Sequence, residues 1–223
     1  MSRPCLLFDL DGTLTDADHL HHDAFNAVLA LNGKAHVDVD FYRTRIMGHA
    51  NSVIFETLFP GGPLAMHEAL ALEKEQRFRD LATVLHPIAG LVDLLERAAR
   101  AGVPCAVVTN APRLNADHEM QALGLLRHFG TVVVGEELPH SKPHPLPYLT
   151  GLSRLGGDAA RSMGFEDSFS GLRAGLAAGL MMTGLATGHS EERLTREGAT
   201  LAIRRYDDPR LFALIESRLG IAL

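Results

Sequence analysis

The chain has 223 residues, of which 46% are hydrophobic, and it carries a formal net charge of −6 at pH 7. This length allows one globular core together with an insertion. The negative charge and the lack of any Lys- or Arg-rich run exclude a typical nucleic-acid-binding surface, and no apolar stretch has the length of a membrane span. Because the first predicted strand begins close to the N-terminus, without room for a signal peptide, we expect a cytoplasmic protein.

The N-terminal stretch Cys5–Asp16 is an apolar run that ends in carboxylates, a glycine and hydroxyls. Consecutive apolar residues are typical of a strand covered on both faces, as in parallel sheets. Asp9 and Asp11 therefore follow the carboxyl end of a strand, which is the edge where open α/β sheets bind ligands. If the extended geometry continues, both carboxylates point to one side, and their repulsion implies a bound cation. The alternative is an ordinary turn in which Asp11 and Gly12 close the strand.

The segment 16–84 has helical periodicity and contains no stretch that alternates like a strand. An all-helical block directly after the first strand indicates a separate small bundle. We therefore expect two domains: an α/β core formed by residues 1–15 and 85–223, and a helical domain over 16–84. The expected helices of this second domain are 20–31, 39–47, 52–59 and 64–81.

From residue 85 onward, helical and strand patterns alternate. Together with the first strand, the pattern gives five strands joined by crossover helices, which predicts a doubly wound parallel sheet of the α/β class. Segments 194–198 and 211–219 look helical, and 201–203 fits a short strand. The expected strands are 105–108, 132–134, 162–165 and 180–185, and the expected helices between them are 90–101, 114–123, 143–155 and 171–178.

Polar side chains follow three of the later strands. Thr109 and Asn110 come after 105–108, and a hydroxyl and amides at a strand end can bind phosphate oxygens. Taken alone, the pair is more typical of a helix N-cap. Lys142 precedes a predicted helix and could neutralise phosphate charge, whereas an isolated lysine is usually surface. Glu166 and Asp167 end the strand 162–165, where adjacent carboxylates can hold Mg²⁺ or simply cap the next helix.

These four motifs occur in the order Asp-x-Asp, Thr-Asn, Lys-Pro and Glu-Asp, and their conjunction resembles the haloacid dehalogenase (HAD) superfamily. The helical insertion is similar to the cap of the phosphoglycolate phosphatase and β-phosphoglucomutase group. Four of its residues match the DGTLxDSxxLHH start of that group, with Ala17 in place of the usual Ser. The matching residues are Asp16, Leu20, His21 and His22.

The resemblance implies a mechanism with a covalent intermediate. Asp9 would be the nucleophile that forms an aspartyl-phosphate, and Asp11 the general acid and base. Mg²⁺ would be held by Asp9, the backbone carbonyl of Asp11 and Asp167, with Glu166 bound directly or through water.

The phosphoryl oxygens would be held by Thr109, the Asn110 amide and Lys142, as the resemblance further implies. The cap would close over the site to exclude water and contact the leaving group. The cap residues that could face the substrate include His21, Arg45, His49, Asn51 and Lys74, with His21 and Asn51 as the leading candidates. Each could instead be an ordinary surface or packing residue.

The resemblance thus implies a Mg²⁺-dependent phosphatase for a small phosphorylated metabolite of the phosphoglycolate or sugar-phosphate class. The alternative is a β-phosphoglucomutase-like mutase. The resembling mutases carry an Arg in the cap loop three residues after its glycine, and here the loop 48–51 places Asn51 at that position. Arg45 or Lys74 could supply the missing charge instead. A phospho-Asp signalling module fits less well, because such a module is about half this length and lacks a helical insertion. A dinucleotide-binding domain would need G-x-G-x-x-G after the first strand, and the sequence does not have it there.

Overall fold

The computed structural model describes residues 3–47, 49 and 51–220 and divides the chain into two compact units, which are treated separately below. The first unit comprises Met1–Asp16 and His86–Leu223, and the second comprises Ala17–Leu85. Among the described residues, no helix is long and apolar enough to cross a membrane.

The first unit is built on a six-stranded sheet in which all paired strands are parallel. Its strand order is β3-β2-β1-β4-β5-β6, so that the chain reverses its direction of winding at β1. Parallel sheets of this kind are doubly wound and bind ligands at the carboxyl edge near the reversal point. The strands are β1 (Leu6–Phe8), β2 (Cys105–Thr109), β3 (Phe129–Val134), β4 (Met163–Glu166), β5 (Met181–Leu185) and β6 (Leu201–Ile203).

β1 is a central strand, and its register aligns three strand ends. Leu6 is opposite Cys105 of β2 on one side and opposite Met163 of β4 on the other. All three residues of β1 are fully buried, as its continuous apolar sequence predicts. The residues that follow β1, β2 and β4 therefore emerge at the same edge of the sheet.

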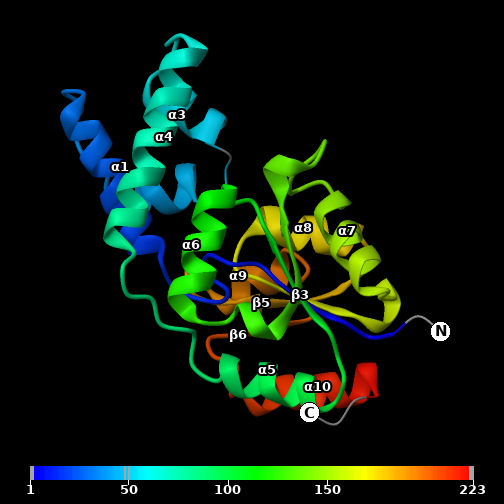
Figure 1. Cartoon of the computed structure of the whole chain (residues 1–223). Coiled ribbons are helices and arrows are strands. Elements are labelled where there is room, and N and C mark those ends of the chain that lie inside the picture. The colour runs from blue at the N-terminus through cyan, green and yellow to red at the C-terminus, as the bar shows by residue number, and fades with distance from the viewer. Residues whose placement is uncertain (1–2, 48, 50, 221–223) are drawn as a thin grey trace. The chain divides into compact units, whose positions relative to one another are not determined.

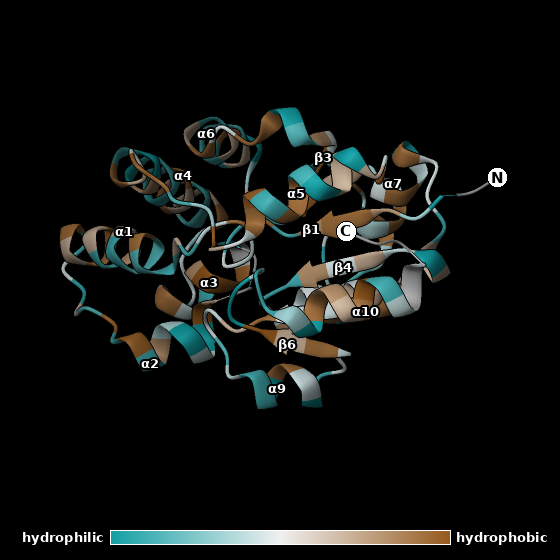
Figure 2. Cartoon of the chain, turned by 90° about the horizontal axis from the view of Figure 1, so that it is seen from below, coloured by the Kyte–Doolittle hydropathy of each residue, from teal (hydrophilic) through white to brown (hydrophobic). Residues whose placement is uncertain are grey.

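Helices cover both faces of this sheet, as Figure 1 shows. α7 (Leu146–Leu155), α8 (Phe169–Ala177) and α9 (Glu191–Arg196) pack on one face, where their apolar side chains share a core with Leu7. α5 (Leu91–Arg100) and α10 (Pro209–Leu219) lie on the other face, and β1 and β4 are seen between them in Figure 2. The Arg97 guanidinium of α5 lies 5.0 Å from the centroid of the Phe212 ring of α10. On that face the rings of Phe8 and Phe165 stack with their centroids 4.5 Å apart. α6 (Arg113–Leu123) follows β2.

The second unit contains only helices among its described residues. Its core joins apolar side chains of α1, α3 and α4, including Phe25, Phe55 and Leu70. Its elements are α1 (Asp18–Leu31), α2 (Val39–Phe41), a π-helical turn (Tyr42–Ile46), α3 (Asn51–Leu58) and α4 (Leu64–Leu81).

The prediction of a doubly wound parallel α/β sheet is confirmed, and several element bounds differ from the prediction; β3, for example, begins at Phe129 and not at 132. The sheet has six strands, because 201–203 pairs with β5 at the edge. α7 begins at Leu146 and not at 143, since prolines at 143 and 145 keep these residues in the preceding loop. α9 begins at Glu191, because the Ser190 hydroxyl accepts from the Arg193 amide and caps it. The expected helix 39–47 is split into α2 and the π-helical turn.

Candidate active site

The carboxylate of Asp9 lies directly after β1, at the carboxyl edge of the sheet. Its backbone N–H donates to the Phe165 carbonyl of β4 at 3.0 Å, which continues the sheet pairing by one residue. Its side chain is buried, and one carboxylate oxygen accepts from Lys142 Nζ at 2.7 Å. The central strand thus fixes a carboxylate at the edge where three strand ends meet.

A tight turn follows Asp9 and brings Asp167 against the backbone of Gly12. Gly12 has φ +69°, and a Cβ there would lie 2.1 Å from Asp167 Oδ2. Only glycine leaves room for that carboxylate, and only glycine adopts this φ at no steric cost. The Thr187 hydroxyl donates to the Gly12 carbonyl at 2.8 Å and holds the turn from the end of β5. Asp11 lies in the same turn and forms an isolated bridge with Thr15.

Lys142 connects Asp9 to Glu166. Its ammonium donates to Asp9 Oδ1 at 2.7 Å and to Glu166 Oε1 at 2.5 Å, and the lysine side chain is nearly inaccessible to solvent. Burial works to lower the pKa of Lys142, but the two carboxylates raise it above its ordinary value. Lys142 is therefore a charged group at the site and not the surface lysine of the alternative interpretation.

Glu166 is held in place by three donors. Besides Lys142, the Tyr148 hydroxyl donates to its Oε1 at 2.7 Å, and the Ser168 hydroxyl donates to its Oε2 at 3.1 Å. A Cβ at Gly171, in the first turn of α8, would lie 1.9 Å from the Glu166 carboxylate. This glycine leaves the space that the carboxylate occupies, and the fully buried charge is compensated by hydrogen bonds and an ion pair.

Thr109 and Asn110 end β2 next to the Lys142 loop. The buried Thr109 hydroxyl accepts from the Ala111 amide at 2.9 Å. The Asn110 side chain pairs with the backbone of Lys142, since its oxygen accepts from the Lys142 N–H and its nitrogen donates to the Lys142 carbonyl, both at 3.1 Å. The Asn110 side chain therefore holds the lysine loop onto the end of β2.

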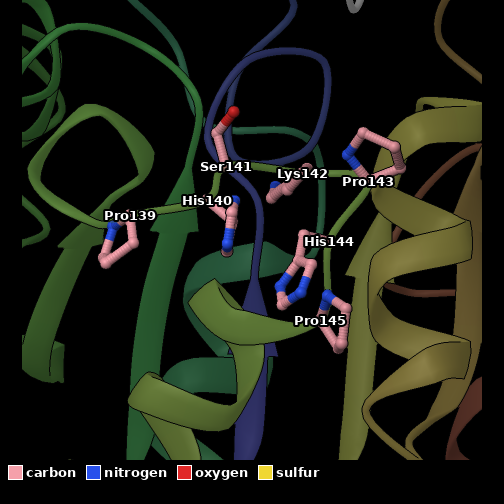
Figure 3. A pocket seen from close by; sticks show the side chains of 7 residues that line it. All are labelled: Pro139, His140, Ser141, Lys142, Pro143, His144 and Pro145. Carbon is pink, nitrogen blue, oxygen red and sulfur yellow. The ribbon is translucent and has the colours of Figure 1, made fainter.

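This loop also lines an open hollow over residues 139–145, shown in Figure 3. His140 and His144 point to the same side of the loop, with ring centroids 4.5 Å apart, whereas Ser141 points to the other side. His144 Nδ1 accepts from the Leu146 amide at 3.1 Å, in the first turn of α7. The loop is therefore tied both to β2 and to the start of α7.

The charges at this edge do not balance. Carboxylate oxygens of Asp9, Glu166 and Asp167 lie within 4.8 Å of one another, all three residues are buried, and the ammonium of Lys142 supplies one positive charge. Burial and the charge of Glu166 raise the pKa of Asp9 to about 7, although Lys142 opposes them. A divalent cation would relieve this repulsion, and three carboxylates are the hard oxygen donors that Mg²⁺ takes. The residues present therefore fit a Mg²⁺ ion.

The second unit brings together three of the candidate substrate residues, His21, Asn51 and Lys74. The buried Lys74 ammonium donates to His21 Nδ1 at 2.8 Å and to both oxygens of Glu75 at 3.1 Å. Asn51 Nδ2 donates to Glu75 Oε1 at 2.8 Å, and the His21 ring stacks on Phe78. His21 and Asn51 thus belong to one buried polar network. The predicted loop 48–51 is described only in part, because Gly48 and Ala50 lie outside the described residues.

The comparison with known families agrees with the order of these motifs. Residues 6–185 match the haloacid dehalogenase-like hydrolases. The chain belongs to this family. The sequence-based prediction of HAD superfamily membership is therefore confirmed.

Several HAD relatives cover nearly the whole chain. A phosphoglycolate phosphatase of Mesorhizobium japonicum is 30% identical over 213 residues, which are 93% of this chain and 93% of that protein. An N-acetylmuramic acid 6-phosphate phosphatase of Pseudomonas aeruginosa is 30% identical over 215 residues, which are 94% and 93% of the two chains. The CbbY protein of Rhodobacter sphaeroides, solved in complex with xylulose-(1,5)bisphosphate and with phosphate, matches with a TM-score of 0.82 and 26% identity, over 92% of this chain and 96% of that one.

The structure adds residues to the HAD motifs that the sequence analysis did not single out. Tyr148, Ser168 and Gly171 all serve the Glu166 carboxylate. Ser168 could have been found as a helix N-cap, because its hydroxyl also accepts from the Gly171 amide. The sequence gives only a weak indication of a role for Tyr148, namely a hydroxyl on the buried side of a predicted helix. Its partner becomes apparent only when α7 is packed across β2 and β3.

Proposed function

We propose that this HAD hydrolase is a Mg²⁺-dependent phosphatase that releases inorganic phosphate from a small phosphomonoester through an aspartyl-phosphate. The observation that carries the proposal is Asp9 at the end of the central strand, with one oxygen bound by the buried ammonium of Lys142. An ammonium at this point can stabilise the nucleophile and a phosphoryl group beside it, which is the electrostatic task of phosphoryl transfer.

Four residues would hold the metal ion. Mg²⁺ would bind Asp9, Asp167 and the backbone carbonyl of Asp11, with Glu166 adjacent or bridged by water, since its two oxygens already accept from three donors. When bound, the ion supplies positive charge that offsets the repulsion between a phosphate ester and the carboxylates. Gly12 gives Asp167 the space to reach this position.

Asp9 is the proposed nucleophile. Lys142 fixes its Oδ1, which orients the carboxylate toward the phosphorus of a bound ester. Attack on phosphorus breaks the ester bond and transfers the phosphoryl group to Asp9, so that one difficult hydrolysis becomes two easier steps. Thr109, the backbone N–H of Asn110 and Lys142 would bind the phosphoryl oxygens.

Asp11 is the proposed general acid and base. It would protonate the leaving alkoxide in the first step and then take a proton from the water that hydrolyses the aspartyl-phosphate. It lies two residues after Asp9, in the turn that Gly12 allows.

We propose that the helical unit Ala17–Leu85 acts as the cap of this enzyme, with His21 and Asn51 as the residues that recognise the leaving group. The names of the relatives describe phosphatases that act on phosphoglycolate and on phosphorylated sugars. We therefore infer a substrate of similar size, a small phosphorylated carboxylic acid or sugar.

Hydrolysis is proposed in preference to phosphosugar mutase activity because of the network around Asn51. A mutase must bind a bisphosphate and needs a cationic fork for the second phosphate. Asn51 carries no charge, and its amide donates to Glu75. Supplying β-glucose 1-phosphate with catalytic bisphosphate, and following glucose 6-phosphate, tests this choice. Efficient isomerisation without matching phosphate release would establish the mutase instead.

The proposed function is tested by incubating the purified protein with a panel of phosphorylated carboxylic acids and sugars, with Mg²⁺ and with excess EDTA. We expect phosphate release from at least one member, strongly preferred over the others, only when Mg²⁺ is present. Full activity after exhaustive chelation would contradict the metal role of Asp9 and Asp167, and no release from any member would contradict the phosphatase.

A further inference from the structure

We propose that the Tyr148 hydroxyl is a positioning group for catalysis, which holds Glu166 so that the Lys142 ammonium stays aimed at Asp9 and at the phosphoryl group. The expected effect on kcat rests on the proposed phosphatase function, whereas the expected effect on the position of the Lys142 ammonium does not. Tyr148 touches no reacting atom and acts through its neighbours.

The first argument is the bond that the hydroxyl makes. Tyr148 lies on α7 and is fully buried, in a core that includes Leu7, Val108 and Leu152. A phenyl ring would fill this position equally well, so packing does not account for the oxygen. Among the described residues, its hydrogen bond is to Glu166 Oε1, at 2.7 Å. The hydroxyl is the donor in this bond, because an ionised carboxylate can only accept.

The second argument is that Tyr148 and Lys142 share one acceptor atom. Glu166 Oε1 accepts from both, and Lys142 Nζ also lies 5.3 Å from the centroid of the Tyr148 ring. The tyrosine therefore acts on the lysine in two ways. Its ring lies near the ammonium, and its hydroxyl binds the Glu166 carboxylate that accepts from that ammonium. If Glu166 turned away, Lys142 would lose one of its two anchors.

The third argument is the number of protons on the ammonium. Lys142 has three N–H donors, of which two are used by Asp9 Oδ1 and Glu166 Oε1. Within the part of the chain that the structure describes, these are the hydrogen bonds of the ammonium, and the third N–H would bind an oxygen of the phosphoryl group. Fixing two N–H directions also fixes the third, and the Tyr148 hydroxyl contributes to that fixation by preventing rotation of the Glu166 carboxylate.

The kinetic test is Tyr148→Phe, which removes the oxygen and keeps the ring. We expect kcat to fall by about 10- to 100-fold, the usual cost of removing a partner that orients a catalytic group, while KM changes little. In a Lys142→Met background the same substitution should have no further effect, since the hydroxyl acts through the lysine. Equal losses in both backgrounds would overturn the proposal, as would an unchanged kcat in the single variant.

Ser162→Ala is the matched control. Ser162 immediately precedes β4, at the end opposite Glu166, and its buried hydroxyl accepts from the Cys5 amide and donates to the Asp158 carbonyl. The substitution removes a buried hydroxyl whose two hydrogen bonds go to neither Lys142 nor Glu166. We expect Ser162→Ala to lower the melting temperature at least as much as Tyr148→Phe and to leave kcat unchanged.

A second measurement does not depend on activity or on the stability of Lys142→Met. The chain has three lysines, of which Lys34 is exposed and Lys74 and Lys142 are buried. In protein labelled with ¹⁵N at the lysine side chains, the Lys142 ammonium should give a resolved signal that shifts or broadens in Tyr148→Phe, with the Lys74 signal as the internal reference. An unchanged Lys142 signal would overturn the proposal. Failure of the wild type on every phosphate ester would instead overturn the phosphatase function and leave this result standing.

Discussion

The two units each contain a buried lysine paired with a buried glutamate, and the difference between them lies in the surrounding charge. At the sheet edge, Lys142 pairs with Glu166 but also with Asp9, and Asp167 adds a third carboxylate. In the helical unit, Lys74 pairs with Glu75, and the other contributors to that network are an imidazole nitrogen and an amide. One cluster has surplus negative charge, and the other is balanced.

The pKa shifts of the two clusters run in opposite directions for this reason. Burial and Glu166 raise the pKa of Asp9 to about 7, more than Lys142 can offset. Burial also works to raise the pKa of Glu75, but Lys74, His21 and the hydrogen bond from Asn51 together lower it. Buried carboxylates whose charges are not balanced are suited to a cation and to chemistry. The balanced cluster stabilises the helical unit and so holds His21 and Asn51 in place. The following predictions test this contrast.

The largest effect is expected at Asp9. Asp9→Asn should abolish turnover, because the amide is nearly isosteric but not nucleophilic, and it should leave the fold intact. Phosphate release and circular dichroism measure the two expectations. Asp93→Asn is the matched control, since this carboxylate lies exposed on α5 in a surface pair with Arg97. Substantial turnover by pure Asp9→Asn would be incompatible with the covalent mechanism.

Asp11→Asn should lose the proton transfers, which typically contribute about 10²–10⁴-fold. The loss should be smaller for p-nitrophenyl phosphate than for an alkyl phosphate, because an activated leaving group needs no acid. Comparing kcat for the two esters checks this. If both esters lost rate equally, or the alkyl ester kept the wild-type rate, Asp11 would not be the acid.

In the helical unit the expected effect is on stability. Lys74→Met leaves Glu75 buried without its cation, and breaking a buried pair in this way costs roughly 3–5 kcal/mol. Urea unfolding measures the loss. Replacing the pair together, as Lys74→Met with Glu75→Leu, should recover much of it, and Lys34→Met at an exposed position is the control. If Lys74→Met alone were as stable as the wild type, the network would not stabilise the helical unit.

The smallest effect is a change in acid sensitivity. Because the folded protein lowers the pKa of Glu75, its ionised form stabilises the fold above the ordinary glutamate value, and this contribution is lost as the pH falls through the lowered pKa. Glu75→Gln has no such contribution. The difference in unfolding free energy between wild type and Glu75→Gln should therefore shrink between neutral and acidic pH. A constant or growing difference would mean that the charge on Glu75 does not stabilise the unit.

The sequence was sufficient to predict the sheet and the strand ends, because both depend on local pattern. The apolar run before Asp9 indicates a buried strand, and parallel pairing then places the ends of β1, β2 and β4 at one edge. The contact of Lys142 with Asp9 follows from that topology, although the two residues are 133 positions apart.

What the sequence did not reveal depends on how helices pack. Tyr148 reaches Glu166 only because α7 lies across β2 and β3 at one particular angle, which periodicity does not determine. Lys74 resembled a surface or substrate residue, yet the pairing of α1 with α4 buries it beside His21, 53 positions away in the chain. Buried polar pairs between helices leave no short-range signal.

The central claim is that the sheet-edge cluster performs phosphoryl transfer through Asp9, and trapping the intermediate tests it most directly. The wild type is quenched with acid during steady-state turnover with Mg²⁺ and its preferred ester, digested with pepsin, and analysed by mass spectrometry. We predict one phosphoryl group on the peptide that contains Asp9, and none in Asp9→Asn treated in parallel. A phosphoryl group on any other residue would contradict the account. The Asp11→Asn variant should hydrolyse the intermediate slowly, so turnover by this variant without a phosphorylated Asp9 peptide would also contradict it.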